Sequence, residues 1–352
     1  MKIELFISVF FYVLIITKSV PDDKEQTIVN IYYSKDSKNY TINISKNIDE
    51  DAIAYAIYNK SYERTGWDFL SISTYDKDDK KYNDTDKAYA MGYLEGVLTK
   101  DRIYSYAINM IHLFGTSQTN FTIPDIIKEP FKRNIDYMKK KSLEKMDTDI
   151  KWENIYYIYQ QLIGLYDGYM SVAEKEKQFE FEEFIILPSA VDVEDISKFL
   201  IRKYRPNLIE MRDEEIKRYF LLNSHCSALI KLADDFSDIW FGHNTWFTYN
   251  SMIRIFKEYR FISNKRNEKS KTVSFSSYPA TLYSLDDFYY LDSNLLVMET
   301  TNSIFEQNLY DLVNPEALFT WVRAILANRL ASSAEEWTNI FKIENSGTYN
   351  NQ

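Results

Sequence analysis

The feature that most constrains this chain is its cysteine content, because Cys226 is the only cysteine in 352 residues. The first twenty residues are typical of a secretion signal, with Lys2 before an apolar stretch at 5–16 and Pro21 after it. Secreted proteins commonly pair their cysteines in stabilising disulfides. One cysteine forms none within the chain, so this thiol is either incidental or kept for its reactivity. With 45% hydrophobic residues, the chain can still bury a sizeable apolar core.

Composition and short motifs narrow the cellular setting and the classes of function. Five Asn-x-Ser/Thr sequons predict a glycoprotein, either secreted or in the lysosomal lumen. These sequons begin at Asn39, Asn43, Asn59, Asn83 and Asn120. The apolar stretch at 5–16 is too short to span a bilayer, so no stable membrane span is expected once a signal peptide at 1–20 is removed. A formal net charge of -10 argues against nucleic acid as a partner. Three scattered histidines and one thiol supply no metal site, and no cofactor is expected.

The periodicity of apolar residues predicts an α+β fold in layers. The predicted strands lie at 27–45 (a hairpin), 65–72, 226–233, 239–246, 272–276, 280–285 and 295–301. The predicted helices lie at 48–63, 86–113, 123–146, 150–172, 252–259, 315–330 and 334–341. Pro315 suits a first helical turn, and Ser332 with Glu335 suits a capping box. The chain therefore divides into a helix-rich region, 21–225, and a region that starts at Cys226 and carries the chemistry, 226–352.

Cys226 opens an apolar, strand-like run, which leaves two interpretations of the thiol. If strands 226–233 and 239–246 form a hairpin centred on Phe236, Cys226 lies opposite Trp246 and near His243 and Asn244. The thiol is then either a nucleophile or a buried free cysteine, which is a common fate for this residue type. A papain-type Cys–His pair is disfavoured because its sequence signature around the cysteine is missing.

A cut between His225 and Cys226 would make Cys226 an N-terminal residue. Its free α-amino group, with a pKa of about 7.7–8.0, could then take the thiol proton. The same thiol could make the cut by attacking the His225 carbonyl, with Asn244 donating a hydrogen bond to the oxyanion.

An ordered series of sequence runs extends from about residue 65 to the end of the chain. The runs are 92–96, 161–169, 225–231, 242–246, 276–279, 286–289, 299–301, 321–323, 327–331 and 345–352. This series resembles the phospholipase B-like family. The resemblance implies an N-terminal nucleophile hydrolase fold, a four-layer αββα sandwich that is cleaved before the cysteine. Family members continue well past the position of Gln352, so the resemblance implies a sandwich that is incomplete at the C-terminus.

The resemblance also implies a chemistry and a set of site residues. It implies hydrolysis of fatty-acyl ester bonds of phospholipids, with Cys226 as nucleophile and the cleavage site between His225 and Cys226. The further site candidates are His243, Asn244 and Asn345 for catalysis, and Trp246 and Thr301 for substrate binding. Two alternatives stay open: an amidase of the same fold, and a catalytically inert glycoprotein that binds lipid or a partner.

Several residues in these runs have a simpler structural interpretation. Trp246 and Tyr278 are interpreted as packing residues before any chemical role, and Arg254 as a salt-bridge residue. Gly92 and Gly96 are expected to allow close packing of two helices.

Overall fold

The N-terminal part of the chain forms the outer strands of a central sheet. The computed structural model describes residues 26–37, 39–75, 81–110, 123–223, 226–265, 267–301 and 304–349. Strands β1 (Gln26–Ser34) and β2 (Asn39–Ser45) pair antiparallel, with Tyr33 opposite Tyr40. The predicted hairpin at 27–45 is confirmed.

The central sheet has eight strands in the order β10-β9-β8-β7-β4-β3-β1-β2. Its remaining strands are β3 (Ala54–Asn59), β4 (Asp68–Thr74), β7 (Ile255–Arg260), β8 (Thr272–Ser277), β9 (Phe288–Leu291) and β10 (Leu296–Met298). Strands β4 and β7 pair in parallel, from Asp68 opposite Ile255 to Ser73 opposite Arg260, and the other pairings are antiparallel. The first and last parts of the chain therefore share one mixed sheet.

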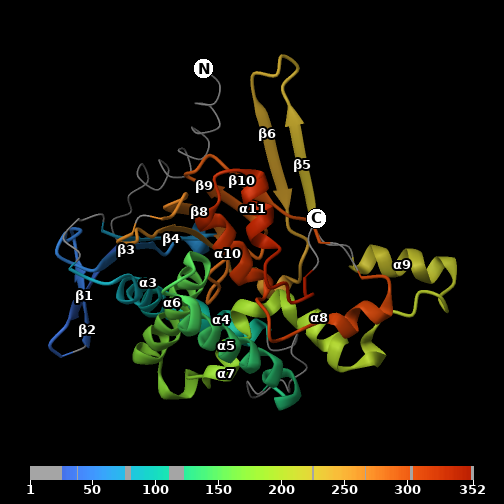
Figure 1. The fold of residues 1–352 in the computed structure, drawn as a ribbon, viewed down its shortest axis with the longest axis horizontal. Helices are drawn as coiled ribbons and strands as arrows, with labels where there is room; N and C mark the ends of the chain where they lie inside the picture. The colour runs from blue at the N-terminus through green and yellow to red at the C-terminus, as the bar shows by residue number, and fades with distance from the viewer. Residues whose placement is uncertain are drawn as a thin grey trace.

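Helices lie on one face of the central sheet, beside its β9–β10 end and at one end of the molecule. They are α2 (Tyr62–Thr65), α3 (Asp84–Leu98), α4 (Lys100–Met110), α5 (Asp125–Lys145), α6 (Ile150–Val172), α7 (Phe181–Phe184), α8 (Ala190–Leu200), α9 (Asp213–Asn223), α10 (Thr320–Leu330) and α11 (Ala334–Phe341). Figure 1 shows α3, α5, α6 and α7 below the sheet, while α9 lies apart at one end of the molecule. The apolar core lies between the sheet and these helices and includes Ile72, Leu94 and Leu162, all fully buried.

Glycines bring α3 and α6 into close contact, as the sequence predicts. A Cβ atom at Gly92 would lie 1.9 Å from the Gln161 carbonyl oxygen, and one at Gly96 would lie 2.2 Å from the Leu165 carbonyl oxygen. The helix backbones therefore touch at positions where only glycine fits.

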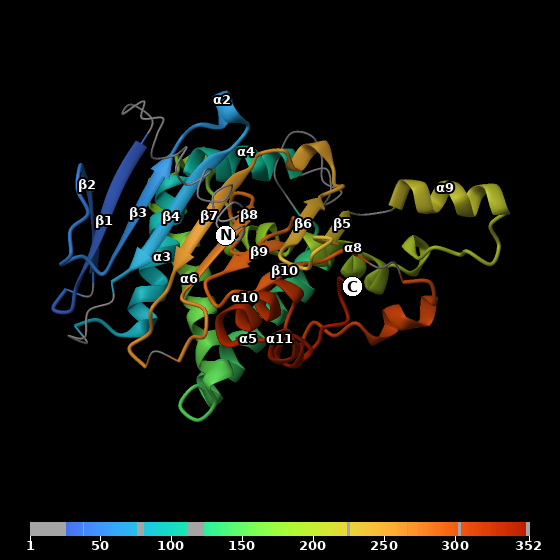
Figure 2. The same cartoon turned by 90° about the horizontal axis from the view of Figure 1, so that it is seen from above.

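Strands β5 (Ser227–Leu232) and β6 (Ile239–Asn244) form a separate two-stranded sheet. Figures 1 and 2 show this hairpin projecting away from the central sheet, on the side opposite α3, α5 and α6. Its apolar side chains are strongly exposed, with Ile230 at 62% and Phe236 at 81%. The hairpin is confirmed, but its register pairs Ser227 with Asn244, which puts Cys226 across from Thr245 and not Trp246.

Two of the predicted helices are wrong. Residues 48–63 contain strand β3 and no long helix, and residues 252–259 contain most of strand β7. In both segments the side chains alternate between buried and partly exposed, which is the period of a strand. In β7 the buried positions include Lys257, so the inward face does not appear as an apolar pattern in the sequence.

Smaller errors concern the ends of elements. No strand forms at 280–285, strand β9 was missed, and the helix predicted at 315–330 begins only at Thr320, so Pro315 is outside it. The helix predicted at 86–113 is two helices, α3 and α4, and residues 111–113 lie outside the described residues. Ser333, not Ser332, caps α11 by accepting a hydrogen bond from the Glu336 amide.

The architecture is a mixed α+β fold, as predicted at the level of fold class. Among the described helices, none combines the length and the apolar character that crossing a bilayer requires.

Candidate functional site

Cys226 lies at the base of the projecting hairpin, between α9 and β5. It is half-buried, and its backbone has a φ of 56°. This left-handed conformation is uncommon for a residue with a side chain and costs about 1–3 kcal/mol. The proposed cleavage partner His225 lies outside the described residues.

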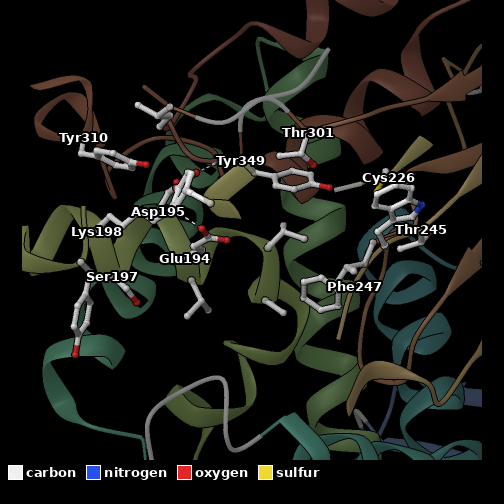
Figure 3. A pocket seen from close by; sticks show the side chains of 18 residues that line it. Glu194, Asp195, Ser197, Lys198, Cys226, Thr245, Phe247, Thr301, Tyr310 and Tyr349 are labelled. Carbon is white, nitrogen blue, oxygen red and sulfur yellow. Dashed lines mark hydrogen bonds and ion pairs between the residues drawn. The ribbon is translucent and has the colours of Figure 1, made fainter. Parts of the chain in front are cut away.

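A cavity of about 430 Å³ opens beside Cys226, within the size range of ligand pockets. Residues of α8, α9 and the hairpin base line it, together with residues from several loops and C-terminal segments. The lining residues are Ala190, Val191, Val193, Glu194, Asp195, Ser197, Lys198, Tyr204, Tyr219, Cys226, Thr245, Trp246, Phe247, Leu285, Thr301, Ile304, Tyr310 and Tyr349. Figure 3 shows Cys226, Thr301 and Tyr349 at one end and Lys198 and Tyr310 at the other. The cavity thus has a thiol at one end, apolar walls, and charged groups such as Lys198 towards the other end.

The surroundings of the thiol keep it protonated. Burial raises the pKa of Cys226, and the nearby negative charge of Glu299 raises it further. A hydrogen bond from the Trp246 backbone amide opposes this shift by lowering the pKa. A base must therefore remove the thiol proton before the sulfur can attack a substrate.

His243 and Asn244 face different surroundings although they are neighbours on β6. The His243 Nε2 atom lies 2.8 Å from the Glu299 carbonyl oxygen, and because a carbonyl only accepts, His243 donates this hydrogen bond. Burial lowers the pKa of His243, so the ring is neutral at neutral pH. Asn244 is exposed and is not among the cavity residues. His243 therefore contacts the backbone of Glu299, near the cavity, whereas Asn244 stays at the surface.

The other candidates from the sequence are also divided between the cavity and the surface. Trp246 and Thr301 line the cavity with Cys226. Asn345 is exposed, its Oδ1 atom accepts a hydrogen bond from the Gly347 amide, and it does not line the cavity. Arg254 forms an ion pair with Asp286, as predicted, and Tyr278 is fully buried.

The sequons are mostly at the surface. Asn39, Asn43 and Asn83 are exposed, and Asn59 is half-buried at the end of β3. Asn120 lies outside the described residues. Glycosylation at these positions stays a prediction.

Sequence reasoning missed three residues next to the thiol, namely Asp287, Glu299 and Tyr349. Their charges or hydroxyl groups interact with Cys226 or with each other. All three lie in runs that carry the family resemblance, 286–289, 299–301 and 345–352. A search of those runs for titratable side chains would have found them.

Two aspartates of α8 hold the C-terminal segment against the cavity. The Thr348 hydroxyl donates to Asp192 over 2.5 Å, and the Tyr349 amide donates to Asp195 over 2.8 Å. Complete burial raises the pKa of Asp192 to about 7, although the Thr348 hydrogen bond and the charge of Arg323 act in the opposite direction.

We expect Asp192 to make the folded protein more stable in mild acid. Its folded pKa exceeds that of an unfolded aspartate, so between about pH 4 and 7 the folded state binds the additional proton. The contribution of Asp192 to the unfolding free energy should rise by about 1 kcal/mol per pH unit as the pH falls from 7 towards 5. In Asp192→Asn this contribution should vanish, as measured by urea unfolding at several pH values.

The matched control for this prediction is Asp235→Asn. Asp235 is an exposed carboxylate in the hairpin turn, and its pKa is lowered, chiefly by the Ser237 hydroxyl. Its substitution should leave the wild-type rise in stability towards acid in place. Parallel stability curves for the wild type and Asp192→Asn would contradict the assignment.

Comparison with known proteins gives one consistent result. The family model described as Phospholipase B matches residues 54–352. Phospholipase B-like protein B of Dictyostelium discoideum is 37% identical over 324 residues, which cover 92% of this chain and 55% of the relative. Phospholipase B-like 1 of Rattus norvegicus is 35% identical, with 91% and 56% covered. Phospholipase B of Crotalus adamanteus is 34% identical, with 92% and 57% covered. The chain thus spans little more than half the length of these relatives.

Proposed function

Because the chain belongs to the phospholipase B family, we propose that it carries the nucleophile of an acyl hydrolase acting on phospholipid esters. Cys226 is the proposed nucleophile. We infer the substrate class from the names of the relatives, and we infer the nucleophile from the position of Cys226 beside the cavity. Because the chain spans only 55% of the length of the first relative, the proposal concerns the part of the active site that it contains.

The observation that carries this proposal is the position of Cys226 at one end of an apolar-walled cavity. Val191, Val193, Phe247 and Leu285 line the cavity walls and could contact a fatty-acyl chain. An acyl chain lying along these walls would bring its carbonyl carbon to the thiol at the end of the cavity.

The proposed reaction forms and then breaks a thioester. The Cys226 sulfur attacks the acyl carbonyl, the alcohol leaves, and water releases the fatty acid. A protonated thiol needs a base, and the α-amino group of Cys226 becomes available as that base if the chain is cut before this residue. The left-handed backbone at Cys226 supports such a cut, because cleavage would release its strain.

The fold proposal is the αββα sandwich of N-terminal nucleophile hydrolases. One sheet with a helical layer on one side supplies two of the four layers. The exposed apolar side chains of the β5–β6 hairpin support the view that this hairpin belongs to a second sheet. Residues 21–225 and 226–352 would then become the smaller chain and the start of the larger one, in a glycoprotein that is secreted or lysosomal.

A second candidate function is lipid binding without turnover. It is favoured by the raised pKa of the thiol and by the exposed positions of Asn244 and Asn345, which leave no amide side chain of these two beside the sulfur. An amidase with the same nucleophile is a third candidate, since a thiol attacks amide and ester carbonyls alike.

Trapping the acyl intermediate tests the proposal directly. The protein is mixed with a phospholipid, quenched in acid, digested and analysed by mass spectrometry. We expect the mass of one fatty-acyl group on the peptide that contains Cys226, and release of that group by hydroxylamine. Fatty acid release without an acylated peptide would contradict the nucleophile, and bound lipid without release would favour the binding candidate. Acylation by a fatty amide but not by the phospholipid would favour the amidase.

A further inference from the structure

Two carboxyl groups lie together behind the wall of the cavity. Asp287 precedes β9 and is 5% exposed, and Glu299 follows β10 and is 7% exposed. The Glu299 amide donates to the Asp287 carbonyl oxygen over 3.2 Å, which fixes the two backbones side by side. The Tyr349 hydroxyl bonds to Asp287 Oδ2 and lies 3.2 Å from Glu299 Oε2. One hydroxyl group therefore bridges two carboxyl groups.

This pair retains a proton at neutral pH. Burial raises the pKa of Asp287 well above its usual range, and the charge of Glu299 and a hydrogen bond with it raise the pKa further. Two adjacent carboxylates repel each other strongly when both are ionised, so the pair holds one proton and one negative charge.

The pair lies between two cavities. On one side Tyr349 lines the cavity that contains Cys226, and Figure 3 shows its hydroxyl end turned towards Cys226. On the other side Asp287 and Glu299 line a second cavity of about 200 Å³, which Trp337 and Phe341 of α11 also line. This space is large enough for water, which would let the pair exchange its proton.

We propose that the Asp287–Glu299 pair, acting through the Tyr349 hydroxyl, supplies the proton to the alcohol that leaves when Cys226 is acylated. The inference rests on the proposed function of Cys226 as nucleophile. Asp287 and Glu299 are positioning residues here, and Tyr349 is the group that would touch the substrate.

Every proton transferred in the proposed step has a donor and an acceptor. As the sulfur–carbon bond forms and the carbon–oxygen bond breaks, the leaving oxygen takes the hydroxyl proton of Tyr349. Tyr349 takes the shared proton of the pair, and the pair regains a proton from the α-ammonium group that accepted the Cys226 thiol proton. The net change is transfer of the thiol proton to the alcohol.

Most of the other titratable groups around the pair keep the same protonation state between pH 5 and 9. The neighbouring phenols are Tyr278, Tyr283, Tyr289 and Tyr349, and burial raises the pKa of each. His243 contacts the Glu299 backbone, and Asp192, which faces Tyr283, titrates near 7. Arg254 and Asp286 form an ion pair beside Tyr278. Both arms of the test are therefore repeated in Asp192→Asn, in which the titration of Asp192 is absent.

The first arm of the test needs no hydrolytic activity. Because the chain has one cysteine, alkylation by iodoacetamide reports Cys226 alone. Glu299→Gln removes a negative charge beside the thiol, so its pKa should fall and alkylation at pH 8 should accelerate by about threefold to tenfold. Glu268→Gln is the matched control, because Glu268 is also 7% exposed and lines neither cavity. Unchanged alkylation both in folded Glu299→Gln and in the folded double variant Asp287→Asn with Glu299→Gln would overturn the inference, because no negative charge of the pair would then act on the thiol.

The second arm compares two esters of the same fatty acid. A phospholipid releases an alkoxide that needs a proton, whereas a nitrophenyl ester releases a stable anion that does not. Tyr349→Phe and Glu299→Gln should lower kcat/KM about a hundredfold for the phospholipid and much less for the nitrophenyl ester. Equal losses on both esters would show a merely structural role and overturn the inference while leaving Cys226 as nucleophile. A wild type inactive on both esters would overturn the proposed function and the proton transfer with it.

Discussion

Replacing Gly92 with alanine should destabilise the protein by more than about 3 kcal/mol. The added Cβ atom would lie 1.9 Å from the Gln161 carbonyl oxygen and 2.7 Å from the Leu165 amide nitrogen, both backbone atoms of α6. Neither atom can move without shifting a whole helix. In a solvent-exposed helix the same substitution stabilises by about 1 kcal/mol, so the sign of the effect identifies the helix contact.

A shift of α3 would also disturb a buried ion pair. Glu95 of α3 lies 2.7 Å from the Lys257 ammonium group of β7, and both side chains are completely buried. Separating them would leave two uncompensated charges inside the protein, which is strongly destabilising. Urea unfolding of Gly92→Ala should therefore show a lower midpoint, or the protein should not accumulate in folded form.

Gly242 provides the matched control. It lies on β6, and a Cβ atom there would meet no atom within 4 Å. Gly242→Ala should change the unfolding free energy by less than about 0.5 kcal/mol. If Gly92→Ala were as stable as Gly242→Ala, the close approach of α3 and α6 would be wrong.

The sequence predicted those parts of the fold whose pattern is local. The long helices α5 and α6 have a clear helical period, and the β1–β2 hairpin alternates over both strands. Residues 252–259 failed because their apolar residues also match the spacing of a helix. The inward position Lys257 is neutralised by Glu95, 162 residues away in the sequence, and no local pattern contains that contact.

The candidate site was predicted in part, for a similar reason. Cys226, Trp246 and Thr301 were selected from the sequence and line one cavity. Tyr349 and Asp287 were not, because their proximity arises from contacts across 62 residues. Asn244 was selected as a neighbour of the thiol, but adjacent residues of a strand point to opposite faces, and His243 takes the inner position.

Replacing Cys226 with alanine should abolish hydrolysis while leaving the fold intact. The half-buried sulfur contributes little to the apolar core, so the substitution should lower the unfolding free energy by only about 1 kcal/mol. Loss of the nucleophile should lower the rate of fatty acid release about a thousandfold or more. If the thiol also cuts the chain, N-terminal sequencing of the wild type expressed in a secretory host should give a new terminus at Cys226, and the alanine variant should remain uncut.

Two further variants separate the thiol from its surroundings. Ser227→Ala changes an exposed neighbour on β5 and should leave both cleavage and hydrolysis unchanged. Cys226→Ser keeps the size and the hydrogen-bonding position of the side chain but supplies a weaker nucleophile, so it should be cut slowly and retain only a small part of the activity. A wild-type terminus at Cys226 that persists in the alanine variant would mean that another protease makes the cut. Unchanged hydrolysis in the alanine variant would mean that Cys226 is not the nucleophile.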